Sequence, residues 1–146
     1  MKPIYLDGTM DSITVVMAAA AQTTNPDWTA HYHDNTPLGN NYDSTDGTLN
    51  GTTPVTLVAA AASLSQTRIV DEIIIQNRDS APVTITIRFV SGTGTRQLWS
   101  GTLQIGDTWS LAEGVRDTNG NIKFVQGIAT PYPPMANLST IRFFDR

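Results

Sequence analysis

The chain has 146 residues, of which 40% are hydrophobic and only 15% charged, and it carries a formal net charge of -4 with no cysteine. The length fits one domain. The missing cysteines exclude disulfides and thiolate zinc sites, and the acidic balance argues against nucleic-acid binding. Thr, Ser and Asn replace many charged residues, which make up about 25% of an average protein. Because Thr suits half-exposed strands, the composition predicts an all-β fold.

The N-terminal region, residues 1–33, mixes short apolar runs with polar breaks, a pattern typical of an extended arm or of accessory strands. Ile4 and Leu6 alternate along it, and we expect both to contact a partner. Its run "ITVVMAAAA" at 13–21 has the length of a signal-peptide core, but two aspartates precede it and Lys2 is the only basic residue upstream. We therefore expect neither a secretion signal nor a membrane span, which needs about 18 apolar residues.

His31 and His33 form a His-x-His pair. On a strand both rings face one side and so have the spacing to bind one metal ion. No third ligand is specified and the chain has no other histidine, so a structural or surface pair is the favoured interpretation and no cofactor is expected. A histidine near the axis of a homotrimer would supply three ligands, which leaves a shared metal open.

Residues 34–53, "DNTPLGNNYDSTDGTLNGTT", consist almost entirely of turn-forming residues. They predict a long polar loop, and loops of this length are usually functional or disordered. Leu38, Tyr42 and Leu49 are its large apolar residues. We expect Tyr42 to contact a partner.

From Pro54 onwards, short apolar runs alternate with turn residues. This pattern is typical of an antiparallel β-sandwich or a jelly-roll-like domain, and it assigns residues 54–146 to the sandwich body. The predicted strands are 54–59, 68–77, 83–90, 96–105, 108–111, 121–125 and 140–145.

The stretch "RIVDEIIIQNRDSAPVTITIRF" at 68–89 predicts a hairpin with its turn at 77–82. Its second strand has a clean polar face, but the first carries Val70 and Ile74 opposite its other isoleucines. The additional apolar face requires a cover, either from a second layer of the same chain or from another subunit. Val70 and Ile74 are therefore candidate interface residues.

The last predicted strand, "TIRFFD" at 140–145, places Phe143 and Phe144 on opposite faces. Such a strand is either a core strand covered on both sides or an interface strand. The proline-rich segment 130–139 before it is pre-ordered in an extended form. We expect Tyr132 and Phe144 to contact partners.

The aromatic residues allow two interpretations. Large rings usually fill a sandwich core or an interface, but Trp28, Tyr32, Tyr42 and Tyr132 lie in or beside predicted loops. Trp28 and Tyr32 are the candidates for exposed rings that stack on glycans. No Gly-x-Ser-x-Gly motif or distinctive pair of carboxylates singles out a catalytic residue, so no enzymatic activity is expected.

The succession "TPVTLVAAAA", "RIVDEIIIQNRDSAPVTITIRF", "LWSGTLQIGDTWSL" and "NGNIKFV", within residues 53–126, resembles small β-sandwich virion proteins of tailed bacteriophages. In that group a strand ending in Asn precedes a Val- and Thr-rich partner. A turn with Gly-Asp follows, here between Leu103 and Leu111. The resemblance covers about half of the chain. It implies a non-enzymatic assembly role, often as a homotrimer.

From this resemblance we expect a capsid decoration (cement) protein that bridges major capsid subunits on the virion surface after assembly in the host cytoplasm. The alternative is a tail or fibre module that binds host glycans or mediates head–tail or tail assembly.

Overall fold

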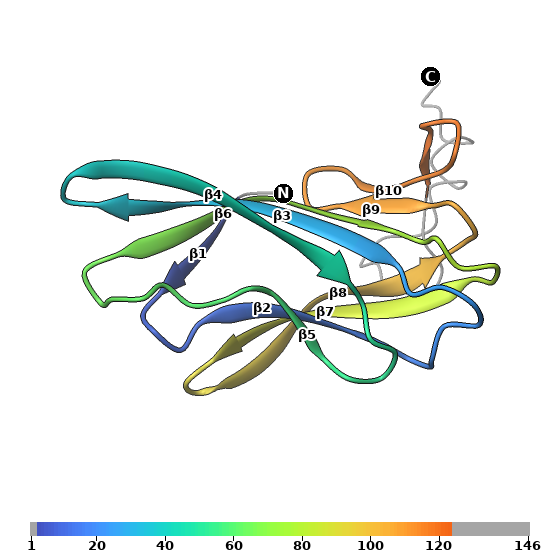
Figure 1. The fold of residues 1–146 in the computed structure, drawn as a ribbon, viewed down its shortest axis with the longest axis horizontal. Coiled ribbons are helices and arrows are strands. Elements are labelled where there is room, and N and C mark those ends of the chain that lie inside the picture. The colour runs from blue at the N-terminus through green and yellow to red at the C-terminus, as the bar shows by residue number, and fades with distance from the viewer. Residues whose placement is uncertain (1–2, 124–146) are drawn as a thin grey trace, which may run out of the picture.

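The computed structural model describes residues 3–123, which form a sandwich of two antiparallel β-sheets (Figure 1). The predicted all-β antiparallel sandwich is therefore confirmed. The seven-stranded large sheet contains β1 (Ile4–Asp7), β3 (Asp27–Thr36), β4 (Gly39–Thr48), β6 (Thr67–Gln76), β9 (Thr108–Ser110), β10 (Gly114–Arg116) and β11 (Ile122–Lys123). The four-stranded small sheet contains β2 (Ser12–Met17), β5 (Val55–Val58), β7 (Val83–Ser91) and β8 (Gly94–Leu103).

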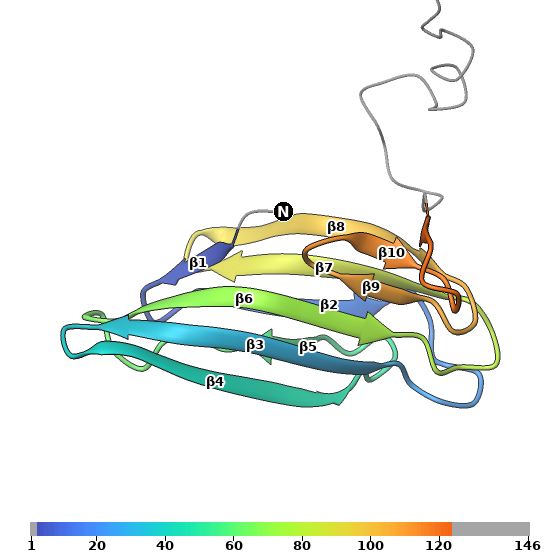
Figure 2. The same ribbon diagram turned by 90° about the horizontal axis from the view of Figure 1, so that it is seen from above.

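The large sheet has the strand order β11, β10, β9, β6, β3, β4, and β1 pairs with the first part of β6. The small sheet has the order β5, β2, β7, β8. Figure 2 shows β4 at one margin of the molecule, beside β3. Among the described strands, β4 therefore forms one edge of the large sheet.

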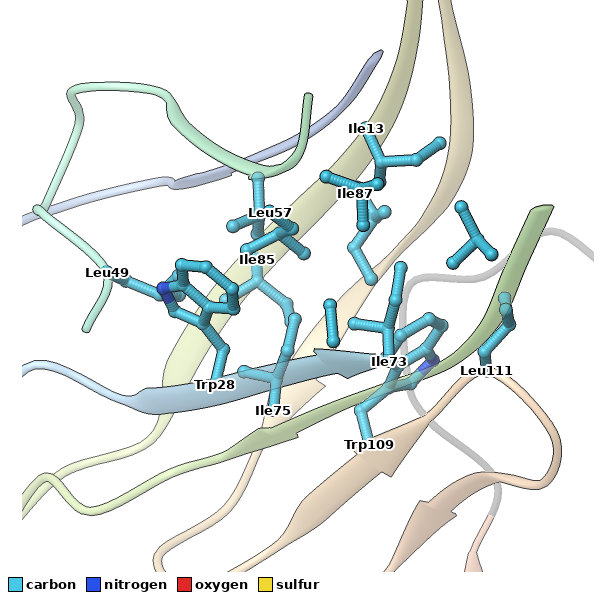
Figure 3. Packing of buried hydrophobic residues seen from close by; sticks show 14 of the residues in the cluster. Ile13, Trp28, Leu49, Leu57, Ile73, Ile75, Ile85, Ile87, Trp109 and Leu111 are labelled. Carbon is cyan, nitrogen blue, oxygen red and sulfur yellow. The ribbon is translucent and has the colours of Figure 1, made fainter. Parts of the chain in front are cut away.

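Alternating apolar residues from both sheets meet in one core (Figure 3). Trp109 of the large sheet packs on Trp99 of the small sheet, with ring centroids 5.5 Å apart. Each fully buried Leu or Ile contributes about 1.5–3 kcal/mol to folding. The largest fully buried side chains are Trp109, Leu6, Ile13, Leu49, Leu57, Ile73, Ile75, Ile85, Ile87, Leu103 and Val15.

The predicted hairpin at 68–89 is wrong, because β6 and β7 belong to different sheets. The connection between them crosses from one sheet to the other. Asn77 Nδ2 fixes this crossing by donating to the carbonyl oxygens of Ala81 and Leu103 at 3.0 and 3.1 Å. The inner faces of β6 and β7 supply opposite walls of the core, and β7 forms its hairpin with β8.

Residues 34–53 are not a long loop, because most of them belong to a hairpin of β3 and β4. Its register is unbroken from the pair Asp27 and Thr48 to the pair Thr36 and Gly39. Gly39 has a φ of 120°, a conformation that favours glycine over residues with a side chain. Nearly all of β4 is exposed, so neither face requires apolar residues and the usual alternation is missing.

The described part of residues 1–33 consists of integral strands rather than an arm. β2 lies between β5 and β7 in the small sheet, and β1 pairs with β6 in the large sheet. Leu6 of β1 and Ile13 of β2 are both 0% exposed. These strands are therefore needed to close the core.

Candidate interaction surface

Turns from both sheets gather at one end of the sandwich, where β1–β2, β3–β4 and β7–β8 connect (Figure 1). Three large apolar side chains are exposed there or in the segment that precedes β6: Met10 at 66%, Leu38 at 100% and Leu64 at 82%. Met10 lies beside Gly92, and Leu64 lies beside Gly8. We call this region the apolar end. Exposed apolar residues on the turns of a rigid scaffold are typical of a binding region.

A row of four side chains crosses the outer face of the large sheet near the apolar end. The strand registers place Tyr5 beside Ile69, Ile69 beside His33, and His33 beside Tyr42. Tyr5 is 56% exposed and Tyr42 is 70% exposed. The rings of His33 and Tyr42 have centroids 4.9 Å apart. This outer row adds aromatic contact area to the apolar end.

A β-bulge lies next to the outer row. The register between β3 and β6 shifts at Asp71, which has no partner on β3. The extra residue turns Val70 to the inner face, where it is 0% exposed, although its spacing from Ile73 had predicted opposite faces. The prediction that Val70 contacts a partner is therefore wrong. The Asp71 carboxylate lies 2.8 Å from His33 Nδ1 on the outer face.

An ion pair joins the same strands on their inner side. The Nε and Nη2 groups of Arg68 donate to the two carboxylate oxygens of Asp34 at 2.7 and 2.8 Å. The guanidinium also lies 4.2 Å from the centre of the Tyr32 ring. The hydrogen bonds from Arg68 lower the pKa of Asp34, and burial raises the pKa of Tyr32. This carboxylate is occupied by a structural contact that holds β3 to β6.

Buried polar side chains tie the connections at the opposite end of the sandwich, which we call the polar end. Asp79 is 3% exposed. Its carboxylate accepts hydrogen bonds from the backbone N–H groups of Gln22, Thr23 and Thr24 at 2.7, 2.7 and 3.1 Å. These bonds, led by that from Gln22, hold the pKa of Asp79 far below its ordinary value. One carboxylate thus joins the β2–β3 connection to the β6–β7 connection.

Asn77 and Asp107 extend these ties to the turn between β8 and β9. The backbone N–H of Asn77 donates to the carbonyl of Asp107 at 2.9 Å, and the carbonyl of Asn77 accepts from Gly106 N–H at 3.2 Å. The Asp107 carboxylate accepts from Gln104 N–H at 2.9 Å and from Lys123 Nζ at 2.8 Å. The three connections at the polar end therefore form one hydrogen-bonded unit.

The two rings predicted to face glycans are buried. Trp28 and Tyr32 are each 7% exposed, because alternation along β3 points both into the core. Trp28 lies against Gly47 of β4. Among the described residues, its Nε1 is the buried side-chain polar atom without a hydrogen-bond partner. The glycan prediction is wrong for both residues, and the exposed rings are those of Tyr5 and Tyr42.

The remaining predicted interface residues have different outcomes. Leu6 is a core residue and is not available to a partner, and Ile4 is half-buried against the core. Ile74 is 38% exposed on the outer face of β6, and Tyr42 is more exposed still. Their contact with a partner stays a prediction. The residues that lie outside the described range are Tyr132 and Phe144, together with the predicted strand 140–145 and the proline-rich segment 130–139.

His31 and His33 lie on the same outer face of β3, as their spacing predicts. His31 is exposed, whereas His33 contacts Asp71 and Tyr42. Within residues 3–123, no group of three or more His, Asp or Glu side chains is placed to hold a metal ion.

Tyr5, Met10 and Leu64 were not among the residues predicted to contact a partner. Met10 and Leu64 stand in turn-forming stretches between strands, where a large apolar side chain has no core to enter. A large apolar residue within a turn-forming stretch could therefore have predicted an exposed side chain. Tyr5 gave no such signal, because an isolated strand pattern does not tell which face meets the core.

Comparison of the chain with protein-family models, with curated proteins and with solved structures gives no match. The part of the chain that the structure describes contains no helix long and apolar enough to cross a membrane. A functional assignment therefore depends on the surface geometry and on the resemblance noted in the sequence.

Proposed function

We propose that this chain is a non-enzymatic virion structural protein, namely a capsid decoration protein that bridges major capsid subunits on the virion surface. The observation that supports this proposal is the gathering of Met10, Leu38 and Leu64 at one end of a rigid sandwich. The exposed rings of Tyr5 and Tyr42 lie on the adjoining sheet face. Large apolar and aromatic side chains supply most of the binding energy of protein interfaces.

The charged groups support a contact role rather than catalysis. Asp34 is paired with Arg68, and Asp79 is enclosed by backbone N–H groups. Both carboxylates are therefore committed to structural bonds. The three exposed residues that define the apolar end carry no charge, so the burial of these three side chains does not itself remove a charge from water.

A decoration protein of this kind stabilises a capsid through many contacts with capsid subunits, whose binding energies add. A stable interface buries about 800 Å² on each partner. One apolar end that straddles two capsid subunits divides this area between them, and a homotrimer repeats the contact around its axis. Linked contacts raise the overall affinity far above that of one contact. These contacts then keep the capsid subunits together when internal pressure pushes the subunits apart.

The test adds the purified protein to undecorated capsids of the phage that encodes it. We expect the protein to co-sediment with the capsids and to raise their resistance to heat and to low salt. The double variant Leu38→Ser/Leu64→Ser should bind at least tenfold more weakly, a change of about 1.4 kcal/mol. Ile105→Ser is the matched control, because Ile105 is 58% exposed at the polar end. Absence of binding, or equal loss in both variants, would contradict the proposal.

A tail or fibre module that binds host glycans is the second candidate. The observation that favours it is the exposed Tyr42 ring beside His33, since an aromatic face with a polar neighbour suits a sugar ring. Calorimetric titration with host polysaccharide, using Tyr42→Ala as the variant, tests this function. Heat of binding that disappears in Tyr42→Ala would favour the module over the decoration protein.

A further inference from the structure

Two Asn-Gly pairs, Asn50-Gly51 and Asn119-Gly120, lie in connections between strands. Both asparagines are exposed, and both glycines have positive φ, 54° at Gly51 and 84° at Gly120. Because glycine has no Cβ, the backbone nitrogen that follows each asparagine can be approached closely. An asparagine before glycine is therefore well placed to react with its own backbone.

The reaction open to such a pair is deamidation. The glycine nitrogen loses its proton to solvent and attacks Cγ of the asparagine, which closes an imide ring and releases the side-chain nitrogen as ammonia. Water then opens the ring. Cleavage of the bond from the glycine nitrogen to Cγ gives aspartate, and cleavage of its bond to the main-chain carbonyl carbon gives isoaspartate. Water is the only reagent that the sequence of steps requires.

Hydrogen bonds of the turn between β10 and β11 hold the pair Asn119-Gly120. Gly120 N–H donates to the Asp117 carbonyl oxygen at 3.0 Å, and Asn119 N–H donates to the Asp117 carboxylate at 2.8 Å. Asn121 N–H donates to the same carboxylate at 3.0 Å. Since the attacking nitrogen must release its proton, the hydrogen bond from Gly120 N–H has to break before the imide can close. The turn therefore protects Asn119.

The pair Asn50-Gly51, in the connection from β4 to β5, is held differently. The Asn50 carbonyl accepts from Thr53 N–H at 3.0 Å, and the Gly51 carbonyl accepts from Met17 N–H at 3.0 Å. Gly51 N–H donates to no group within residues 3–123. Closing the imide consumes neither carbonyl oxygen. The Gly51 nitrogen can therefore lose its proton without breaking a hydrogen bond to this part of the chain.

We propose that Asn50 is the main deamidation site of the folded protein and that the turn at Asp117 protects Asn119. Breaking one hydrogen bond before the attack slows the reaction about fivefold, which corresponds to about 1 kcal/mol. Asn50 should therefore deamidate about fivefold faster than Asn119 in the folded chain.

The isoaspartate product alters a connection between the two sheets, because it lengthens the main chain by one atom. Leu49, which precedes the site, is 1% exposed, and the Gly51 carbonyl that follows it binds β2. A Cβ atom at Gly51 would lie 3.4 Å from Ala20 Cα, so the backbone has little space to shift. Isoaspartate at position 50 should therefore lower the urea concentration at which the protein unfolds.

This inference goes beyond the capsid proposal and does not depend on it, because it concerns a reaction of the purified chain alone. A protein that fails to bind capsids can still deamidate at Asn50. Equally, a protein that resists deamidation can still bind capsids, so the two failures are distinguishable.

The test incubates the purified protein at mildly alkaline pH and follows both asparagines in the same sample by peptide mass spectrometry. We expect the rate at Asn50 to exceed that at Asn119 about fivefold in the folded protein. In concentrated urea, where the turn is lost, the two rates should become equal. Equal rates in the folded protein, or a ratio that is the same in urea, would overturn the proposal.

Two variants separate the turn from the sequence motif. Asp117→Ala removes the carboxylate that accepts from Asn119 and Asn121, so the rate at Asn119 should rise toward that at Asn50, which stays unchanged. Asn50→Asp carries the charge of the product on a main chain of normal length. After incubation, the native chain should contain a less stable fraction in urea denaturation that freshly prepared Asn50→Asp lacks. An unchanged rate at Asn119 in Asp117→Ala would overturn the protective role of the turn.

Discussion

The two ends of the sandwich differ in the side chains that their connections carry. At the polar end, Asn77, Asp79 and Asp107 are nearly fully buried, and their hydrogen bonds join connections that are distant in sequence. At the apolar end, the turns carry Leu38 and Leu64, whose side chains are directed into solvent. Buried polar groups with partners stabilise the fold, whereas exposed apolar groups add nothing to it. The polar end therefore serves the stability of the chain, and the apolar end is available for contacts with other molecules.

The strongest test of this difference compares two leucines near the apolar end. Leu6→Ala removes a fully buried side chain and should lower the free energy of unfolding by about 3 kcal/mol. Leu64→Ala changes a side chain that is 82% exposed and should change stability by less than about 0.5 kcal/mol. Urea denaturation measures both. A small loss for Leu6→Ala would mean that β1 is an arm after all.

Side-chain hydrogen bonds at the two ends should also differ in their contribution to stability. Asn77→Ala removes hydrogen bonds to Ala81, Leu103 and Gln104 and should cost about 2 to 3 kcal/mol. Thr36→Ala removes two exposed hydrogen bonds in the β3–β4 turn. It should lower the free energy of unfolding by about 0.5 kcal/mol. Equal losses in urea denaturation would show that the ends do not differ in this way.

Acid should weaken the polar end through Asp79. The pKa of Asp79 is lower in the folded chain than in the unfolded chain, whose value is near 3.8. Its stabilising contribution is therefore complete above that pKa and is lost as the pH falls below it. Asp79→Asn should be less stable than the native chain at neutral pH and should lose less stability between pH 5 and about pH 2. Parallel pH profiles for the two proteins would contradict this role.

A small net effect is also expected at Trp28, whose buried Nε1 lacks a partner among the described residues. Trp28→Phe removes that donor and part of a packed ring, so the two effects oppose each other. We expect a net change within about 1 kcal/mol, and no effect on binding to capsids or glycans. A loss above about 3 kcal/mol in denaturation would indicate that the indole N–H has a structural partner.

Local patterns predicted some elements and not others, for physical reasons. Alternation identified β7, because one of its faces is buried and the other is not. β4 has no buried residue and so has no alternation. The three-residue strand β10 has only Val115 buried, which is too little to form a pattern.

Features that depend on contacts between distant parts of the chain could not be predicted from local sequence patterns. The bulge at Asp71 reversed the expected orientation of Val70, and a bulge requires knowledge of the partner strand. The pairing of β7 with β8 rather than β6 likewise depends on which sheet each strand joins. The apolar end emerged only when turns from both sheets were placed together.

Hydroxyl-radical footprinting of the protein, free and bound to capsids, tests the central claim most directly, because it reports the solvent exposure of single side chains. We expect binding to protect Met10, Leu38 and Leu64, while Ile105 and Ile122 at the other end remain as reactive as in the free protein. Protection of Ile105 and Ile122, with the apolar end unchanged, would contradict it.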